Sequence, residues 1–320
     1  MKILVFTHMF PSQKHPENGI FIEQQVASLR KKGIDVEVLF VDVKPSRLNY
    51  IKSFRTFWKH IRRNNFSYDL IHAHYIFAGI VSRIQTKIPV VLTHHGDETF
   101  HGWQSYLCWI TSRLVSKVIV VSQEMKTALG LENVSVIPCG VNCASFFPIN
   151  KMDARRRLGL PIDKYLVLFA GDISKKLKRF DLVEEAVGIL KSKEMNVELV
   201  IAYKKPYELI PYYMNACDVM ILASEREGSP QVIKEALACN LSVISTDVGD
   251  VKEIFNNVNN CFISKREAND FAEKIAFVLQ NNLKSNGREF IRMKYDTNVI
   301  ADRLISIYNS VLDIAVQEPE

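Results

Sequence analysis

Short uninterrupted runs of apolar residues alternate along this chain with longer stretches in which apolar residues recur every three or four positions. The short runs predict buried strands, and the longer stretches predict amphipathic helices. The predicted strands cover residues 2–7, 34–41, 68–73, 89–93, 117–121, 134–137, 165–170, 197–202, 218–223, 241–245 and 261–263. Strands that alternate with helices form βαβ units, which imply parallel sheets with right-handed crossovers. We therefore expect an α/β protein with doubly wound parallel sheets.

The length and the charge narrow this picture. A chain of 320 residues has room for two cores, and SFFPINKMDARRRLGLP, residues 145–161, reads as the linker and the start of a second domain. Hydrophobic residues make up 48% of the chain and charged residues 24%, as in soluble globular proteins. The net charge of +6 fits an anionic substrate or an anionic membrane surface, and it is too small to indicate nucleic-acid binding.

The sequence also carries no pattern for membrane insertion or metal binding. No run approaches the roughly 18 apolar residues that a membrane span needs, and MKILVF leads straight into a strand without a signal-peptide pattern. The six cysteines show no CxxC and no metal-ligand spacing. We expect reduced, buried thiols in a cytoplasmic protein that has no metal site.

The stretch 218–240, DVMILASEREGSPQVIKEALACN, combines a strand, a turn and a helix. Ser229 suits the N-cap of that helix and Pro230 its first position, and Asn240 suits a left-handed stop. Val232, Ile233, Ala236 and Leu237 form one apolar face, away from which Glu235 is expected to point. Glu227 falls in the turn. Carboxylates beside a helix N-terminus suit a ligand with hydroxyls near its phosphates, as in a sugar nucleotide. The alternative is a solvated glutamate pair on an ordinary helix.

The eight-residue spacing from Glu227 to Glu235, with GSP after the first and A-x-A after the second, resembles the E-x7-E signature of family 4 retaining glycosyltransferases. EGSPQVIKEALACNL and STDVGD resemble the branch that builds bacterial surface polysaccharides, of the teichuronic acid type. The resemblance implies the GT-B fold, in which two Rossmann-like domains face a central cleft. It implies an acceptor-side domain over 1–148, to which a last helix at 300–316 crosses back, and a donor domain over 149–299.

The same resemblance implies an activity and a set of donor-binding residues. It implies transfer of a hexosyl unit, with retention, from a nucleotide-sugar (a UDP-sugar) to a hydroxyl of a glycan or lipid-linked acceptor. Lysines and a helix N-terminus replace a metal at the leaving diphosphate, so no cofactor is expected. Lys178 would meet the diphosphate, Glu235 the ribose and Glu227 a sugar hydroxyl. Further donor contacts are assigned to Lys176, Gly228, Ser229, Gln231 and Val232.

One position departs from the family pattern. In G-R-x-x-x-x-K, whose cations hold the diphosphate, Lys178 matches the lysine, but Asp172 stands where the arginine is usual. An aspartate there would repel a pyrophosphate unless it points away or a neighbouring lysine compensates. The lysine cluster around 175–179 still predicts an anion site, and the alternative is a solvated surface turn.

The first domain offers its own candidates. His95-Gly96-Asp97 resembles the family pattern H-G-x-D, whose histidine faces the sugar, and His74 and Asp97 are assigned to the acceptor side. A histidine can donate to a hydroxyl or carry a proton near neutral pH, although a strand-end histidine is more often structural. Gly19 would allow close approach of the backbone to a ligand, and the alternative is a plain βα turn.

Residues 47–65 predict a basic helix with an aromatic-rich apolar face. Such a helix either lies on an anionic membrane leaflet, at the inner face of the membrane, or packs its apolar face into the core with its lysines and arginines solvated. Two rival functions also stay open. A sugar-nucleotide epimerase of the same fold would use the donor without an acceptor, and a degenerate binding protein would hold the nucleotide-sugar without chemistry.

Overall fold

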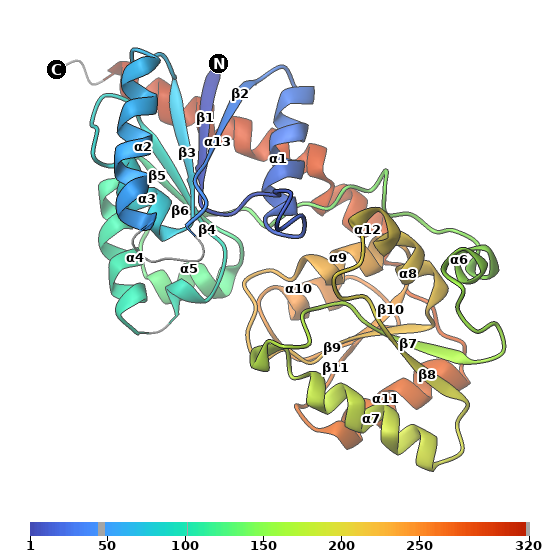
Figure 1. Cartoon of the computed structure of the whole chain (residues 1–320). Helices are drawn as coiled ribbons and strands as arrows, with labels where there is room; N and C mark the ends of the chain where they lie inside the picture. Colours follow the sequence, from blue (N-terminus) through green and yellow to red (C-terminus); the bar gives the residue numbers. More distant parts are fainter. Residues whose placement is uncertain (44–48, 101, 318–320) are drawn as a thin grey trace. The chain divides into compact units, whose positions relative to one another are not determined.

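The computed structural model describes residues 1–43, 49–100 and 102–317 (Figure 1). The chain divides into two compact units. The N-terminal unit comprises Met1–Gly140 together with the last helix, α13 (Thr297–Gln317), and the C-terminal unit comprises Val141–Asp296.

The N-terminal unit is built on a six-stranded parallel sheet in the order β2-β1-β3-β4-β5-β6. The strands are β1 (Lys2–Thr7), β2 (Asp35–Phe40), β3 (Leu70–His74), β4 (Val90–His94), β5 (Lys117–Val120) and β6 (Val134–Val136). The helical segments are α1 (Ile20–Lys31), α2 (Asn49–Arg63), α3 (Ile76–Ser82), the 3-10 turn η1 (Asp97–Thr99), α4 (Gly102–Leu114) and α5 (Gln123–Leu129). Strands β3 and β4 are buried along their whole length because helices cover both faces of the sheet.

The C-terminal unit repeats this architecture with five parallel strands in the order β11-β10-β9-β7-β8. Its strands are β7 (Tyr165–Phe169), β8 (Val197–Ile201), β9 (Val219–Leu222), β10 (Ser242–Ser245) and β11 (Phe262–Ile263). Its helical segments are α6 (Lys151–Leu158), η2 (Lys176–Lys178), α7 (Phe180–Ser192), η3 (Tyr207–Leu209), α8 (Ile210–Ala216), α9 (Gln231–Ala238), α10 (Val251–Phe255), α11 (Ala268–Gln280) and α12 (Gly287–Tyr295). Loops from the carboxyl ends of β7, β9 and β10 therefore leave neighbouring strands at one edge.

The last helix belongs to the first core. Helix α13 packs against α1, and its residues Ile300, Leu304 and Tyr308 are buried among side chains of the N-terminal sheet. The Tyr308 hydroxyl lies 2.7 Å from Nδ1 of His72, which is fully buried in β3. Helix α13 thus supplies both apolar surface and a hydrogen-bond partner to a unit whose remaining residues all precede position 141.

The boundaries between the units differ from the predicted ones at 148 and 299. The first lies at Gly140, because Cys143 and Phe146 are buried in the core of the C-terminal unit. The second lies at Asp296, which forms a β-bridge with Val141 within that same unit. The last helix, predicted at 300–316, begins at Thr297, directly after the end of α12 at Tyr295 and the intervening Asp296.

The basic helix predicted over 47–65 is α2, and positions 47 and 48 lie outside the described residues. Phe57 and Ile61 on its apolar face are fully buried in the core of the N-terminal unit. The core-packing alternative therefore holds for these two residues, and contact of the rest of the helix with an anionic membrane stays a prediction. Within the described ranges, no helix combines the length and the apolar character needed to cross a bilayer.

Candidate functional site

Lys178 and Glu227 meet although they are far apart in the sequence. Lys178 ends η2 in the loop after β7, and Glu227 lies in the loop after the neighbouring strand β9. The Lys178 Nζ donates to Glu227 Oε1 over 2.5 Å, and the Ser224 hydroxyl donates to the same oxygen over 2.7 Å. Both side chains are mostly but not fully buried. The geometry thus holds one cation and one carboxylate together at the carboxyl edge of the sheet.

The two loops are also joined through their backbones. The Glu225 N–H donates to the Leu177 carbonyl over 2.8 Å. Arg179 is held by Asp181 at 2.7 Å and approaches Glu225 at 3.6 Å, so it is already engaged by acids. Lys175 and Lys176 point to solvent from the same loop. Of the three lysines in this loop, Lys178 is the one that pairs with a carboxylate of the opposite loop.

Asp172 forms hydrogen bonds within its own turn and not an ion pair with Lys178. Its Oδ1 accepts hydrogen bonds from the Ser174 N–H at 3.0 Å and from the Ser174 hydroxyl at 2.6 Å. The bond from Ser174 is the main cause that holds the pKa of Asp172 below its ordinary value, so the carboxylate stays charged. The aspartate at the usual arginine position therefore shapes the loop that presents Lys178.

Helix α9 starts one residue later than predicted, and Ser229 does not cap it. The N-cap position belongs to Pro230, with φ −65° and ψ 112°, and α9 begins at Gln231. The Ser229 hydroxyl instead donates to Asp250 Oδ2 over 2.6 Å and accepts a hydrogen bond from the Lys234 ammonium. The N-cap residue Pro230 makes no side-chain capping hydrogen bond, and the N-terminal turn of α9, which contains Gln231 and Val232, presents the positive end of the helix dipole, which favours an anion.

Buried Lys234 explains why Ser229 turns toward Asp250 and does not cap α9. Its side chain is 0% exposed, and its Nζ lies 3.0 Å from Asp250 Oδ2 in the loop after β10. A fully buried ammonium requires acceptors, and Ser229 and Asp250 supply them. This triad was missed in the sequence, although a lysine inside the buried stretch VIKEALA is a signal that an acid must lie nearby.

The loops after β9 and β10 touch through glycines. Gly249 has φ +58°, and a Cβ atom placed on it would lie 2.5 Å from the Gly228 carbonyl oxygen. The Thr246 hydroxyl adds a 2.6 Å hydrogen bond to the Ser224 carbonyl. Gly228 is buried by this packing. The loop after β10 therefore packs against the backbone of the loop after β9, which carries Glu227.

Glu235 is buried, contrary to the expectation that it faces away from the core. Its side chain lies in α9, and its Oε1 accepts a hydrogen bond from the Tyr207 hydroxyl over 2.7 Å. Burial raises the pKa of Glu235 to about 7, although the bond from Tyr207 opposes this shift. Tyr207, from η3 after β8, was not predicted, since nothing in the local sequence pairs it with α9.

The N-terminal unit brings His74 and His95 together. His74 Nδ1 lies 2.8 Å from His95 Nε2, and the two rings stack with centroids 5.1 Å apart. Phe21 and Tyr75 pack against the His95 ring, at 4.8 and 5.0 Å between centroids. Burial lowers the pKa of His95 to about 4. The imidazole is therefore neutral near pH 7, which leaves it the role of a hydrogen-bond donor or acceptor.

The other two predicted residues of this unit take different places. Gly19 has φ +70°, and a Cβ atom on it would lie 2.6 Å from the Met9 carbonyl oxygen. Its glycine is therefore required by the fold of the β1–α1 loop itself. Asp97 begins η1, and its side chain lies outside the described set. Glu98, which was not predicted, accepts from the His95 N–H at 3.3 Å.

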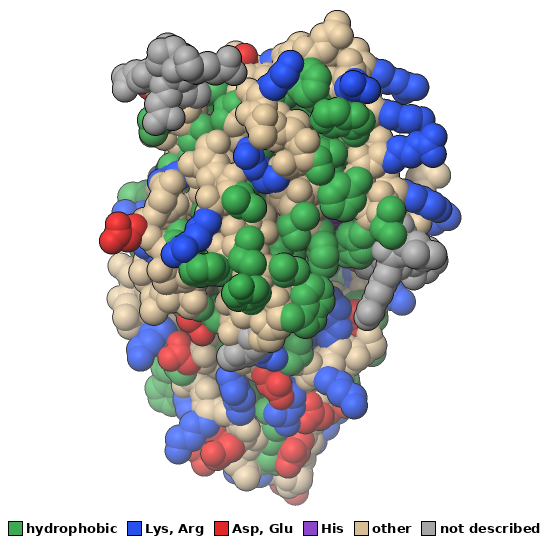
Figure 2. All heavy atoms as spheres, turned by 90° about the vertical axis from the view of Figure 1, so that its left-hand side faces the viewer, with side chains coloured by type: hydrophobic (Ala, Val, Ile, Leu, Met, Phe, Trp, Pro, Cys, Tyr) green, Lys and Arg blue, Asp and Glu red, His purple; other side chains and the backbone are tan. Residues whose placement is uncertain are grey.

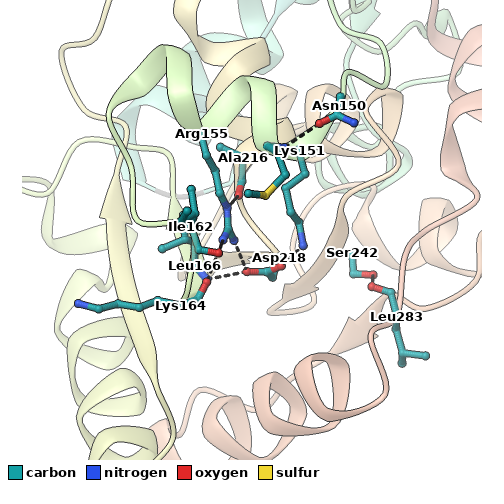
Figure 3. A network of polar contacts seen from close by, with 11 residues as sticks. Asn150, Lys151, Arg155, Ile162, Lys164, Leu166, Ala216, Asp218, Ser242 and Leu283 are labelled. Atoms are coloured by element: carbon teal, nitrogen blue, oxygen red, sulfur yellow. Dashed lines mark hydrogen bonds and ion pairs between the residues drawn. The ribbon is translucent and has the colours of Figure 1, made fainter.

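A pocket of about 140 Å³ lies at the opposite, amino-terminal ends of the strands of the C-terminal unit and is lined by Tyr165, Asp218 and Ser242. Figure 3 shows its polar side: Asp218 accepts from Arg155 at 2.9 Å and from the Leu166 N–H at 2.6 Å, and it also pairs with Lys151. Ser242 donates to the Leu283 carbonyl. These groups satisfy one another, so the network joins α6 to the sheet. Within the described ranges, no group of three His, Cys, Asp or Glu side chains could hold a metal ion.

Comparisons with known proteins place both units among glycosyltransferases. The family model described as Glycosyltransferase Family 4 matches residues 2–145, and the one described as Glycosyl transferases group 1 matches residues 203–293. TuaC of Bacillus subtilis (strain 168), a glycosyltransferase assigned to teichuronic acid biosynthesis, is 28% identical over 345 residues, which cover 86% of this chain and 88% of TuaC.

Solved structures agree in fold. Sucrose-phosphate synthase from Thermosynechococcus elongatus matches with a TM-score of 0.80 at 18% identity, over 98% of this chain and 100% of that one. HepE of Anabaena, solved in complex with UDP-glucose, matches with a TM-score of 0.72 at 20% identity, over 97% of this chain and 100% of that one. Likeness at these identities shows the fold alone. The prediction of two Rossmann-like parallel-sheet units of the GT-B class is confirmed.

Proposed function

We propose that this chain, a glycosyltransferase of the GT-B fold whose two units match glycosyltransferase family models, builds a cell-surface polysaccharide. In this proposal it moves a hexosyl unit from a UDP-sugar to a hydroxyl of a glycan or lipid-linked acceptor, with retention at the anomeric carbon. TuaC is assigned to teichuronic acid biosynthesis, and HepE is solved with UDP-glucose, which supports this class of acceptor and donor.

The observation that carries the proposal is the contact between Lys178 and Glu227 beside the uncapped start of α9. When the bond between the anomeric carbon and the diphosphate oxygen breaks, the electron pair leaves on the diphosphate. A cation and the N-terminal end of α9 at this edge stabilise that charge as it develops. The acceptor hydroxyl forms the new bond to the anomeric carbon, and its proton leaves with the diphosphate or to solvent.

The remaining side chains are assigned to hydrogen bonds with hydroxyl groups of the donor. We assign Glu235 to the ribose, because its carboxylate can accept two hydroxyl hydrogen bonds once it is ionised, and Glu227 to a hydroxyl of the transferred sugar. His95, held neutral by burial, is assigned as a hydrogen-bond partner of that sugar, with His74 fixing its ring. Asp97 stays assigned to the acceptor side.

No metal is required in this scheme, since Lys178 and the α9 N-terminus take the place of a divalent cation at the diphosphate. Transfer by protein treated with EDTA should match transfer by untreated protein. A loss of more than tenfold that added Mg²⁺ or Mn²⁺ reverses would contradict this part of the proposal, because a resident or donor-bound cation would then supply the charge.

A panel of nucleotide-sugars tests the whole proposal. Thermal stabilisation should be largest with one UDP-sugar, and Lys178→Ala and Glu235→Ala should each remove it while the exposed control Lys193→Ala on the C-cap of α7 retains it. Failure of every nucleotide-sugar to stabilise the wild-type protein at millimolar concentration would sink the proposal. Conversion of the donor to an epimer without acceptor would favour the epimerase instead. Asp172, which replaces the usual arginine and would favour a degenerate binding protein, is engaged by Ser174 within its own turn.

We propose finally that the protein works in the cytoplasm and meets lipid-linked acceptors at the inner face of the membrane. The surface that would make this contact lies on the N-terminal unit.

A further inference from the structure

Helices α2 and α4 of the N-terminal unit leave large apolar side chains in solvent. Ile51 is 68% exposed, Trp103 and Tyr106 are each 64% exposed, and Phe54 is also exposed. Figure 2 shows hydrophobic side chains gathered over this side of the molecule, with Lys and Arg side chains along the rim. We call Ile51, Phe54, Trp103 and Tyr106 the aromatic face.

Ring contacts join the helices α2, α3 and α4 that carry the aromatic face and its neighbours. Tyr50, next to Ile51, packs on Phe77 of α3 with centroids 4.5 Å apart, and Phe77 in turn lies 6.4 Å from Trp103. Tyr106 stacks on Trp109 at 6.2 Å, and the Arg113 guanidinium covers the Trp109 ring at 3.7 Å. A connected apolar surface that carries Trp and Tyr is more than the scattered exposed residues that any protein shows.

Positive charge is concentrated in the same segment. Residues 44–123 contain eleven Lys and Arg and three Asp and Glu, so their net charge is +8, whereas the whole chain carries +6. Helix α2 has no acidic residue, and its Lys52, Arg55, Lys59, Arg62 and Arg63 are all exposed. The remainder of the chain is therefore slightly acidic, and the net positive charge of the protein comes from the segment that contains α2, α3 and α4.

We propose that the aromatic face docks on an anionic lipid bilayer, with Trp103 and Tyr106 among the headgroups and the cations of α2 against anionic lipid. Amphipathic rings suit the boundary between headgroups and acyl chains, and juxtaposed Lys and Arg side chains suit a negative leaflet. The inserting element is α4 together with the start of α2. The stripe of α2 that contains Phe57 and Ile61 is already used in the core.

This surface adjoins the ligand edge of its own unit. The Tyr50 ring lies 5.4 Å from that of His8, which directly follows the carboxyl end of β1. A lipid-linked acceptor held at the bilayer would thus present its glycan beside the loops that carry His74 and His95. The inference rests on the proposed function only where it names a lipid-linked acceptor. Docking on lipid itself requires no catalysis.

The natural fluorescence of the protein tests docking directly, because its three tryptophans, Trp58, Trp103 and Trp109, all lie on α2 and α4. The full-length variant W58F/W109F retains Trp103 as its one reporter. With phosphatidylcholine vesicles that contain phosphatidylglycerol, its emission should shift to shorter wavelength and be quenched by brominated acyl chains. With vesicles of phosphatidylcholine alone, both effects should be weak.

Two variants separate the apolar from the electrostatic part. Trp103→Ser with Tyr106→Ser should abolish co-flotation with anionic vesicles at any salt concentration. Lys52→Ala with Arg55→Ala should weaken the vesicle partition coefficient by about fivefold per cation at low salt, and this loss should disappear at high salt. Met293→Ser on α12, an equally exposed apolar residue of the C-terminal unit, should float like the wild type.

Absence of wild-type binding to anionic vesicles at low salt would overturn the proposal, as would unchanged binding of the Trp103→Ser, Tyr106→Ser protein. A concentration-dependent dimer that this variant abolishes, with vesicle binding unchanged, would assign the aromatic face to a second copy and equally overturn it. Unfolding temperature and UDP-sugar affinity report the fold and the donor site of each variant. Vesicle binding by a protein that binds no nucleotide-sugar would support this surface and contradict the proposed function.

Discussion

The ammonium of Lys178 lies 2.5 Å from Glu227 Oε1, so in the absence of donor the proposed diphosphate cation is held by the proposed sugar-binding carboxylate. The Ser224 hydroxyl donates a hydrogen bond to the same oxygen. A donor diphosphate must therefore compete for Lys178 with a carboxylate that its own sugar will later engage.

This relationship predicts different outcomes for its two members. Lys178→Ala should lower kcat/KM by about 10²–10³-fold, because it removes charge stabilisation of the leaving diphosphate. Glu227→Gln should lower kcat as well, yet it should bind UDP at least as tightly as the wild type, since Lys178 is released from its competitor. Calorimetry with UDP and initial rates with the UDP-sugar measure the two effects. Weaker UDP binding by Glu227→Gln would show that the pair does not compete with the donor.

Glu235 should make donor binding depend on pH. Its pKa in the ligand-free protein is raised to about 7 by burial, and only the carboxylate accepts both ribose hydroxyls. Affinity for the UDP-sugar should therefore rise about tenfold from pH 6 to pH 8. Glu235→Gln should bind more weakly and without this pH dependence. A wild-type affinity that stays flat across this range would remove Glu235 from the nucleotide site.

The same group should affect stability with a defined sign. Because the folded pKa of Glu235 lies above its ordinary value, its stabilising contribution is complete below about pH 4.5 and is lost as the pH rises through about 7. In the absence of donor, Glu235→Gln should therefore unfold at a higher temperature than the wild type at pH 8, with a smaller difference at pH 5. Thermal unfolding at both pH values measures this, and an equal difference at both would contradict the burial of an ionising carboxylate.

The buried pair of Lys234 and Asp250 should behave as one unit. Lys234→Met alone leaves the carboxylate of Asp250 buried without its cation, which should cost about 3–5 kcal/mol of the free energy of unfolding. Asp250→Asn alone should have a similar cost, and the double variant should be more stable than either single variant. Urea unfolding of all four proteins measures the coupling. Additive losses would mean that the two charges act independently.

The contact between Gly249 and Gly228 should tolerate no side chain. Gly249→Ala would place a Cβ atom 2.5 Å from the Gly228 carbonyl oxygen, so the loop of Glu227 must move and the KM for donor should rise. Gly159→Ala is the matched control, because Gly159 has a similar φ of +64° but nothing within 4 Å of its Cβ position. Both variants share the left-handed strain of about 1–3 kcal/mol. A donor KM that changes equally in both would assign the effect to strain alone.

The sheets and the ligand edge could be predicted from the sequence because both depend on local patterns. Runs such as VVLTH are buried on two faces, which is typical of parallel strands, and turns after them collect polar residues at one edge. Glu227 in its turn and Glu235 in its helix were placed on this basis. Their chemical roles stay predictions, as does that of His95.

Contacts between separate loops could not be predicted in this way. The partner of Lys234 is Asp250, and the partner of Glu235 is Tyr207, and each pair joins segments whose approach depends on strand order and loop path. Periodicity also cannot distinguish an apolar face that packs on a sheet from one that meets lipid. Helix α2 does the first with Phe57 and leaves Ile51 in solvent.

Helix α13 has a consequence for how the protein is made on the ribosome. Tyr308 packs beside His72 of β3 in the core of the N-terminal unit, yet it is synthesised only after the whole C-terminal unit. The C-terminal unit can fold once Asp296 has emerged, whereas the surface of α1 that packs on α13 stays uncovered until α13 has been synthesised. Nascent chains halted after Asp296 should accordingly bind chaperones. The part of the chain that remains incompletely folded should be the N-terminal unit.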